Sequence, residues 1–140
     1  MSEVLRLQYH ISNSDFTRAG EASSDVKRKL KQMGVDPKVV RRVAIAMYEG
    51  EINMVIHAEG GQIEVIINKS EIKMILSDNG PGIPDIDKAM EEGYSTAPDN
   101  IRTLGFGAGM GLPNMKKYSD SLKIDTKIGV GTKVTMVVKM

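Results

Sequence analysis

The residues best suited to chemistry lie on one segment of the chain, where a carboxylate and an amide share a helical spacing. Glu49, Asn53 and His57 are four residues apart, so on an α-helix they form one stripe in which neighbours differ by about 40°. Glu49 and Asn53 are surrounded on this wheel by apolar residues, namely Ile45, Ala46, Ile52 and Ile56. A carboxylate in such a sector needs a cation or hydrogen-bond donors. The helix alone is equally consistent with a solvent-exposed end on which Glu49 and Asn53 are ordinary surface residues. We expect His57 to be packed or hydrogen-bonded.

A second motif places an acid beside two glycines. The sequence Asp-Asn-Gly-Pro-Gly-Ile, from Asp78 to Ile83, follows the apolar run 72–76. Gly80 and Gly82 have no Cβ and offer backbone N–H groups, so a flat ligand could approach the main chain closely. A nucleobase or a phosphate would suit this geometry. The alternative is a Gly/Pro turn in which Asp78 only caps the backbone.

A third motif is a run of alternating glycines, Gly-Phe-Gly-Ala-Gly-Met-Gly, from Gly105 to Gly111. It ends where helical spacing resumes at 112–119, and consecutive N–H groups beside a helix N-terminus favour anion binding. The irregular segment 93–111 is too long for a passive connector and indicates a mobile lid. The competing interpretation is a flexible linker.

Composition excludes several functional classes. The 140 residues contain no Cys, which excludes disulfides, zinc fingers, iron–sulfur clusters and thiol nucleophiles. A net charge of +1 and 4% aromatic residues argue against a nucleic-acid binder. P-loop, Rossmann and GxSxG motifs are absent. The apolar runs are too short for a membrane span and the N-terminus lacks the apolar core of a signal peptide, so we expect a cytoplasmic protein with no membrane partner.

The elements that must position these motifs can be predicted from periodicity. Alternation predicts strands at 4–11, 63–67, 72–76, 122–126 and 132–139, with hairpin turns at 68–71 and 129–131. Helical spacing predicts a helix capped by Ser14 and ended by Gly34, a long central helix from Asp36-Pro37 to Gly60-Gly61, and shorter helices at 85–92 and 112–119. The first helix would place Phe16, Ala19, Val26, Leu30 and Met33 on its apolar side. The expected fold is an α+β two-layer sandwich, with helices on one face of a mainly antiparallel sheet, forming one domain over 1–140.

Taken in order, the four elements Glu49-x-x-x-Asn53, Asp78-x-Gly80-x-Gly82, Gly105–Gly111 and Gly131-Thr132 resemble those of the Bergerat ATP-binding fold. Gyrase, the heat-shock chaperone ATPases, histidine kinases and MutL share this fold. The short length and the segments DIDKAMEEGYSTA and GAGMGLPNMKKYSD look like the anti-sigma-factor and stressosome switch kinases, the group of SpoIIAB, RsbW and RsbT. The resemblance covers residues 36 to 138 and excludes a complete histidine kinase, since no phospho-acceptor helix is present.

The resemblance implies ATP and Mg²⁺ as cofactors and assigns roles to individual residues. Asn53 would coordinate Mg²⁺, and Glu49 would be the catalytic carboxylate that takes the proton from the attacking hydroxyl. Asp78 would accept a hydrogen bond from the adenine amino group, with Thr132 joined to it through water. Gly80 and Gly82 would shape the adenine pocket. The alternating-glycine segment would surround the triphosphate, through Gly105, Gly107, Gly109, Gly111 and Leu112. Either Arg102 or Lys116 could reach the γ-phosphate.

The function that this resemblance implies is an ATP-dependent serine/threonine protein kinase. Its substrate would be a small STAS-type anti-sigma-factor antagonist, a sigma factor or phosphatase could be a further partner, and a homodimer would be consistent with the group. A second interpretation is a nucleotide-gated binding module that switches a partner without phosphoryl transfer. Slow ATP hydrolysis is a third.

Overall fold

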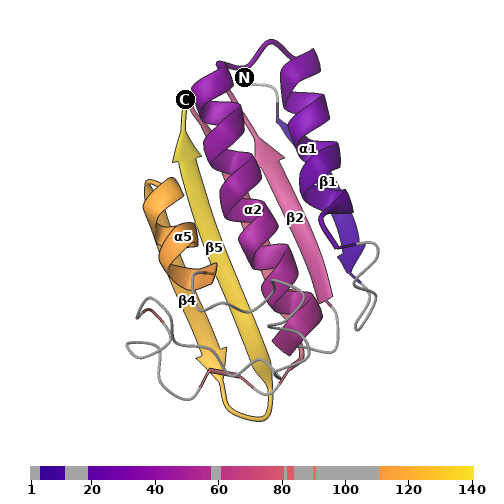
Figure 1. The fold of residues 1–140 in the computed structure, drawn as a ribbon, viewed down its shortest axis with the longest axis vertical. Helices are drawn as coiled ribbons and strands as arrows, with labels where there is room; N and C mark the ends of the chain where they lie inside the picture. The colour runs from indigo at the N-terminus through magenta and orange to yellow at the C-terminus, as the bar shows by residue number, and fades with distance from the viewer. Residues whose placement is uncertain (1–3, 12–18, 58–60, 81, 84–89, 91–110) are drawn as a thin grey trace, which may run out of the picture.

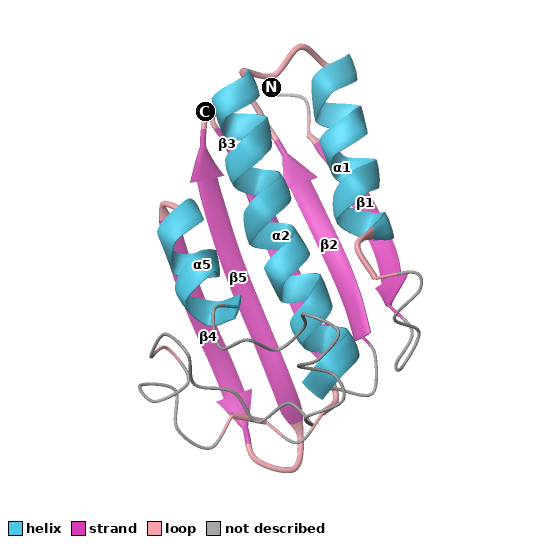
Figure 2. Ribbon diagram, in the orientation of Figure 1, coloured by secondary structure: helices cyan, strands magenta, loops and turns pink. Residues whose placement is uncertain are grey.

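The computed structural model describes residues 4–11, 19–57, 61–80, 82–83, 90 and 111–140, and within them one five-stranded sheet carries three helices on one face (Figures 1 and 2). The strands are β1 (Leu5–Ile11), β2 (Gly61–Ile67), β3 (Glu71–Asp78), β4 (Ser121–Lys127) and β5 (Gly131–Lys139). The helices are α1 (Glu21–Gln32), α2 (Pro37–His57) and α5 (Gly111–Tyr118). All the strand pairs are antiparallel, so the predicted α+β sandwich is confirmed.

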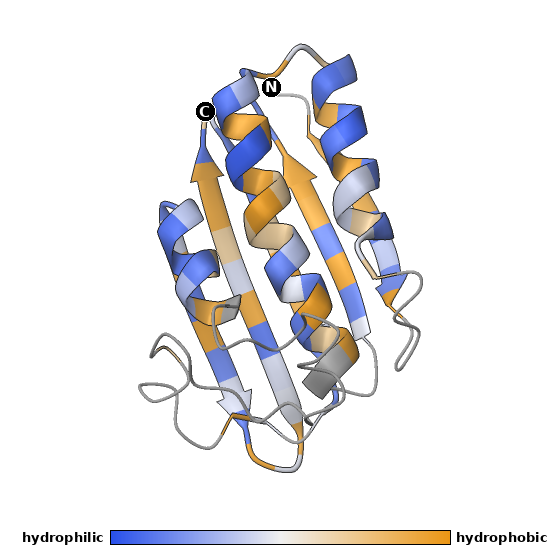
Figure 3. Ribbon diagram, viewed as in Figure 1, coloured by the Kyte–Doolittle hydropathy of each residue, from blue (hydrophilic) through white to orange (hydrophobic). Residues whose placement is uncertain are grey.

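The core lies between the sheet and the helices, because the strands bury every second side chain. On β2 the residues Ile63, Val65 and Ile67 are buried while their neighbours are more exposed, and Figure 3 shows this alternation as bands of colour along the strand. The helices contribute apolar residues to the same layer, chiefly Val26, Leu30, Val40, Val43, Met47 and Met115. Period-two strands packed on helix faces account for the layered fold.

The strand order is β1-β2-β3-β5-β4. Two hairpins join sequential strands, as predicted, and the β2–β3 turn is closed by Asn68, whose side-chain oxygen accepts the N–H groups of Ser70 and Glu71. β3, however, pairs with β5 rather than with the next strand in sequence, β4. This pairing places the end of β3 beside the start of β5. It therefore brings together the two motifs that contain Asp78 and Thr132.

The first helix differs from the prediction at its start, whereas it stops before Gly34 as predicted. It does not run through residues 19–20, which form a turn, and α1 begins at Glu21 with Gly20 as N-cap at φ 97°. Ser14 and Phe16 lie outside the described residues. Met33 was expected on the apolar side but is the C-cap and 50% exposed, because the chain leaves the helix there before Gly34 at φ 78°.

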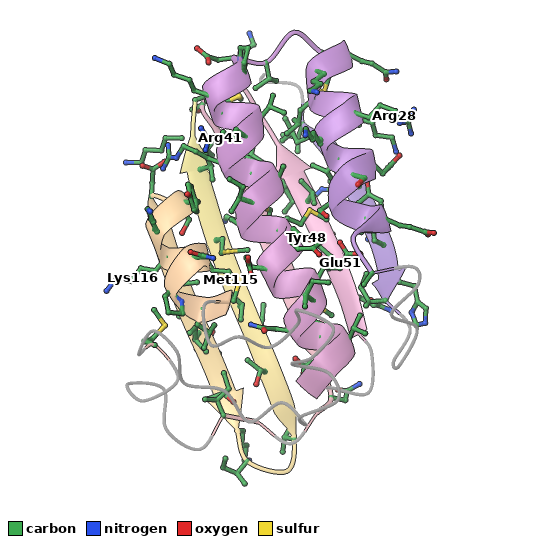
Figure 4. All side chains as sticks on the ribbon, viewed as in Figure 1. Arg28, Arg41, Tyr48, Glu51, Met115 and Lys116 are labelled. Atoms are coloured by element: carbon green, nitrogen blue, oxygen red, sulfur yellow. The ribbon has the colours of Figure 1, made fainter. Side chains whose placement is uncertain are left out.

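The start of α1 is fixed by a side chain from a distant helix. Glu51 of α2 is 2% exposed, and its carboxylate accepts N–H groups from Gly20 (2.9 Å), Ala22 (3.2 Å) and Ser23 (3.0 Å). These are donors that a helix N-terminus leaves without intrahelical partners. Figure 4 shows Glu51 and Tyr48 on the side of α2 that faces α1. The cap therefore ties α1 to the centre of α2.

No helix in the parts of the chain described above is long and apolar enough to cross a membrane.

Candidate active site

A row of small and polar residues crosses the sheet at one end, on the face that the helices cover. Gly61 pairs with Asp78, Asp78 with Thr132, and Thr132 with Thr126. The row lies two residues along each strand from a paired row of core-facing apolar residues, which are Ile63, Leu76, Val134 and Ile124. Because strand side chains alternate between faces, the polar row faces the same layer where the apolar core ends.

The structure brings Asp78 and Thr132 into direct contact. One carboxylate oxygen of Asp78, Oδ1, accepts the Gly80 N–H at 2.9 Å and the Thr132 N–H at 3.3 Å. Among the described residues, no hydrogen bond reaches the second oxygen, Oδ2. Asp78 therefore holds the start of the glycine motif against β5 and keeps one oxygen available for a ligand.

Thr126 was missing from the residues singled out in the sequence. Its hydroxyl lies 2.8 Å from that of Thr132 and accepts the Ile83 N–H at 2.8 Å. A Cβ added to Gly82, at φ 84°, would lie 2.7 Å from the Lys127 carbonyl oxygen. Gly82 and Ile83 are thus held against the end of β4. The signal for Thr126 was its position opposite Thr132 in the predicted hairpin.

Gly131 allows the closest approach in this region, and its replacement tests the arrangement. It has φ 149°, and a Cβ there would lie 2.1 Å from the Asp78 carbonyl oxygen. We expect Gly131→Ala to lower the free energy of unfolding by about 3 kcal/mol or more, since it adds a backbone clash to conformational strain. Gly129→Ala in the same turn is the control, because it has φ 76° and no atom within 4 Å, and we expect it to cost about 1–2 kcal/mol. Urea denaturation of both variants measures this difference, and equal losses would contradict the clash.

The second half of α2 packs closely over this end of the sheet because two residues at the contact, Gly50 and Gly61, have no side chain. A Cβ on Gly61 would lie 2.5 Å from Met54 Cε, and one on Gly50 would lie 2.3 Å from Leu76 Cδ2. Asn53 precedes Met54 and is partly buried. Within the described residues no hydrogen bond engages its amide, so the amide is available to a ligand.

Glu49 lies on the α5 side of α2. It is partly buried, and its Oε1 accepts a hydrogen bond from Asn114 Nδ2 of α5 at 3.3 Å. Burial raises the pKa of Glu49, and the Asn114 hydrogen bond opposes that rise. Glu49 and Glu51 are two residues apart, about 200° on the helix wheel, which is why one carboxylate faces α5 and the other caps α1.

The remaining predicted residues are less fully described. Gly105, Gly107, Gly109 and Arg102 lie outside the described residues, as do the expected lid and all but Met90 of the expected helix at 85–92. Gly111 begins α5 and Leu112 is buried behind it. Lys116 is exposed and points away from α2 (Figure 4). His57 is the last residue of α2.

A surface cavity of about 530 Å³ lies elsewhere, between the start of α1 and α2. Its walls include Gly20, Ser24, Arg28 and Tyr48, and they include none of the predicted nucleotide-site residues. Glu49 lies instead on the α5 side of α2, and Asp78 and Thr132 lie opposite each other on β3 and β5.

Comparisons with known proteins show the family to which this chain belongs. Residues 39–140 match the family described as histidine kinase-, DNA gyrase B-, and HSP90-like ATPase. The chain is 33% identical to the serine/threonine-protein kinase RsbT of Bacillus subtilis, over 76% of this chain and 77% of that protein. It is 34% identical to the anti-sigma F factor of Clostridium beijerinckii, over 73% of each.

Solved structures share the fold at low sequence identity. The RsbU and RsbW domains of a Mycobacterium tuberculosis protein match with a TM-score of 0.63 and 13% identity, over 96% of this chain and 31% of that one. The mycobacterial sensor histidine kinase MprB matches with a TM-score of 0.55 and 17% identity, over 96% and 97%. With its family match and its curated relatives, the chain belongs to the histidine kinase-, DNA gyrase B- and HSP90-like ATPase family, in the group of the anti-sigma serine/threonine kinases.

Proposed function

We propose that this protein transfers the γ-phosphoryl group of ATP to a serine or threonine of a small STAS-type anti-sigma-factor antagonist in the cytoplasm. The observation that carries the proposal is the placement of Glu49 and Asn53, one turn apart and partly buried, on the half of α2 that covers the Asp78–Thr132 row. Membership of a family of ATPases with kinase relatives supports the same chemistry.

In this proposal adenine lies at the polar row. Asp78 Oδ1 is held by two backbone N–H groups, so Oδ2 would accept the hydrogen bond from the adenine amino group. Thr132, joined to Thr126 through its hydroxyl, would complete the polar edge that contacts the base. Gly80 and Gly82 would let the flat base approach the backbone.

The triphosphate would extend from there toward the start of α5. Gly105, Gly107, Gly109, Gly111 and Leu112 would surround it, and Gly111 opens α5, whose N-terminal N–H groups favour a phosphate. Because the described residues include no cluster of three or more acidic or histidine side chains that could hold a metal, most ligands of a cation would come from the nucleotide.

The donor set fits Mg²⁺, which prefers oxygen ligands and is held in such sites by one or two protein groups with phosphate oxygens and water. Asn53 would supply an amide oxygen, since its amide has no partner in the described part of the chain. When bound, Mg²⁺ neutralises charge on the phosphates. By holding the ion, Asn53 would position the phosphates one helical turn from Glu49.

Glu49 would act on the attacking hydroxyl. The partner's hydroxyl oxygen forms a bond to the γ-phosphorus, its proton passes to the Glu49 carboxylate, and the bond from the γ-phosphorus to the bridging oxygen breaks to release ADP. Such proton transfer contributes about 10²–10⁴-fold to a rate. The direct test is incubation with labelled ATP, Mg²⁺ and the STAS proteins encoded by the same genome. Transfer to a serine or threonine is expected, and no transfer to any of them would overturn the kinase proposal.

The binding half of the proposal has its own prediction. We expect Asp78→Asn to weaken ATP binding by about 10–100-fold, because it exchanges a charged acceptor at Oδ2 for an amide that repels the adenine amino group. Calorimetric titration with ATP and Mg²⁺ measures the loss. Asp125→Asn, on the exposed face of β4, is the control and should bind like the wild type. Unchanged affinity in Asp78→Asn would place adenine elsewhere.

The anti-sigma F factor names of relatives extend the proposal to a second partner class. A sigma factor would bind the same protein, with a homodimer as the binding unit. Size-exclusion chromatography with light scattering, with and without ATP, gives the oligomeric state.

A further inference from the structure

A side chain outside the four motifs contacts the proposed proton acceptor. Asn114 lies on α5, three residues after Gly111, and its Nδ2 is 3.3 Å from Glu49 Oε1. Both side chains are partly buried. A carboxylate has no proton to donate in its active form, so only the N–H side of the Asn114 amide can face it favourably.

The position of Asn114 is fixed by its neighbours. Met115 is 1% exposed, and its sulfur would lie 3.3 Å from a Cβ at Gly50, the residue next to Glu49. Figure 4 shows Met115 between α5 and α2. The end of α5 is closed by the Ser119 hydroxyl, which donates to the Met115 carbonyl oxygen at 2.6 Å. Asn114 is therefore presented to Glu49 from a packed helix.

We propose that Asn114 is a positioning residue for Glu49: it holds Oε1 through one N–H, so that Oε2 faces the partner's hydroxyl as an ionised acceptor. This inference rests on the kinase function proposed above. Held at one oxygen, the carboxylate loses its freedom to rotate, and a group aligned in this way needs no reorganisation when the reaction starts.

The hydrogen bond also opposes the effect of burial on Glu49. Burial raises the pKa of this carboxyl, and the Asn114 N–H lowers it. Burial also raises the pKa of Tyr48, and the charges of Glu49 and Glu51 add to that rise. The other titratable or charged groups on the helices and the strand packed around Glu49 are Lys38, Arg41, Arg42, Glu51 and His57 on α2, Glu71, Lys73 and Asp78 on β3, and Lys116, Lys117 and Tyr118 on α5. The causes that act on Glu49 itself are its burial and Asn114.

The test compares Asn114→Leu, which has a similar volume and no donor, with Asn114→Asp, which places a second carboxylate against Glu49. The first measurement needs no kinase activity: the pKa of Glu49 is followed by NMR of its side-chain carboxyl carbon. We expect a higher pKa in Asn114→Leu than in the wild type and a still higher one in Asn114→Asp. Lys117→Ala, exposed on the same helix, is the control and should leave it unchanged.

The second measurement is the pH dependence of phosphoryl transfer. In Asn114→Leu we expect kcat to fall by about tenfold, the loss that corresponds to one hydrogen bond to a charged group, with KM for ATP unchanged. The acid limb of the kcat profile should move to higher pH in step with the Glu49 pKa.

Each outcome decides the inference. A wild-type pKa and rate in Asn114→Leu would overturn it, and so would a lower rate with weaker ATP binding and an unmoved pH profile, which would indicate a structural role. If Glu49→Gln is inactive while Asn114→Leu is fully active, the inference alone fails. If the wild type transfers nothing to its STAS partners, the proposed function fails and the positioning role fails with it.

Discussion

Glu49→Gln is expected to lower phosphoryl transfer by at least about 10²-fold while ATP affinity stays within about threefold of the wild type. Gln has the size of Glu and can still meet Asn114, from which Glu49 Oε1 now accepts a hydrogen bond. It cannot take a proton from a hydroxyl at neutral pH. The change therefore removes one chemical step and leaves the proposed nucleotide contacts of Asn53 and Asp78 in place.

Two assays on the same variant separate the kinase from a nucleotide-gated binding module. Transfer of labelled phosphate measures the first function, and ATP-dependent capture of the partner measures the second. A module without chemistry would transfer no phosphate even as the wild type, and its ATP-dependent capture of the partner would be unchanged in Glu49→Gln. The matched control is Glu64→Gln on the far face of the sheet, where the carboxylate contacts Gln8 and Arg6 among the described residues, and wild-type transfer is expected there.

Glu51→Ala should produce the largest loss of stability, about 3–5 kcal/mol in the free energy of unfolding. The reason is that Glu51 is the shared acceptor for three N–H groups at the start of α1. Truncation leaves these donors buried without a partner and opens a void between α2 and the start of α1. Glu51→Gln keeps one good acceptor oxygen and should fall between the wild type and Glu51→Ala.

Urea denaturation followed by circular dichroism measures both losses. Glu49→Ala, two residues away on α2, is the control, because its carboxylate receives one long hydrogen bond rather than three; we expect it to cost less than about 1.5 kcal/mol. Similar losses for the two alanine variants would show that the carboxylate cap contributes little to holding α1.

Local sequence was enough to predict the elements that carry a hydrophobic pattern within their own residues. Every described strand was predicted from the sequence. The observed bounds extend the predicted ones by one or two residues at an end, as at β2 (Gly61–Ile67) and β3 (Glu71–Asp78), except at β1, which begins one residue later than predicted. The extension is caused by pairing, since Gly61 lies opposite Asp78. Strand order could not be predicted in this way, because the β3–β5 pairing joins segments more than 50 residues apart and depends on the complete core.

The start of α1 shows what local patterns miss. Ser14 has the residue type of a cap, but the donors of this helix are satisfied by Glu51, thirty residues later in the sequence. A signal for Glu51 did exist: it stands four residues after buried Met47 and four before buried Val55, so it interrupts a core stripe of α2 with a charge. Such a charge needs donors from another element.

For the candidate site, sequence spacing identified Glu49 and Asn53 as neighbours, and the motif around Asp78 as an element beside a strand end. Sequence spacing gave no indication of Asn114. A single Asn on a short helix forms no recognisable motif, and its contact with Glu49 arises only because α5 packs beside α2. Thr126 was overlooked for a related reason: its role depends on the partner across the hairpin.

The polar row that includes Asp78, Thr132 and Thr126 faces the helices because side chains alternate between the two faces of a strand. A hairpin that slipped by a single residue would turn Thr132 to the outer surface and bring Lys133 beneath α2. A residue inserted or deleted between Lys127 and Gly131 that caused this slip would therefore weaken the proposed binding of ATP without altering any residue proposed to touch the nucleotide. Engineers who lengthen this exposed hairpin tip should add residues in pairs.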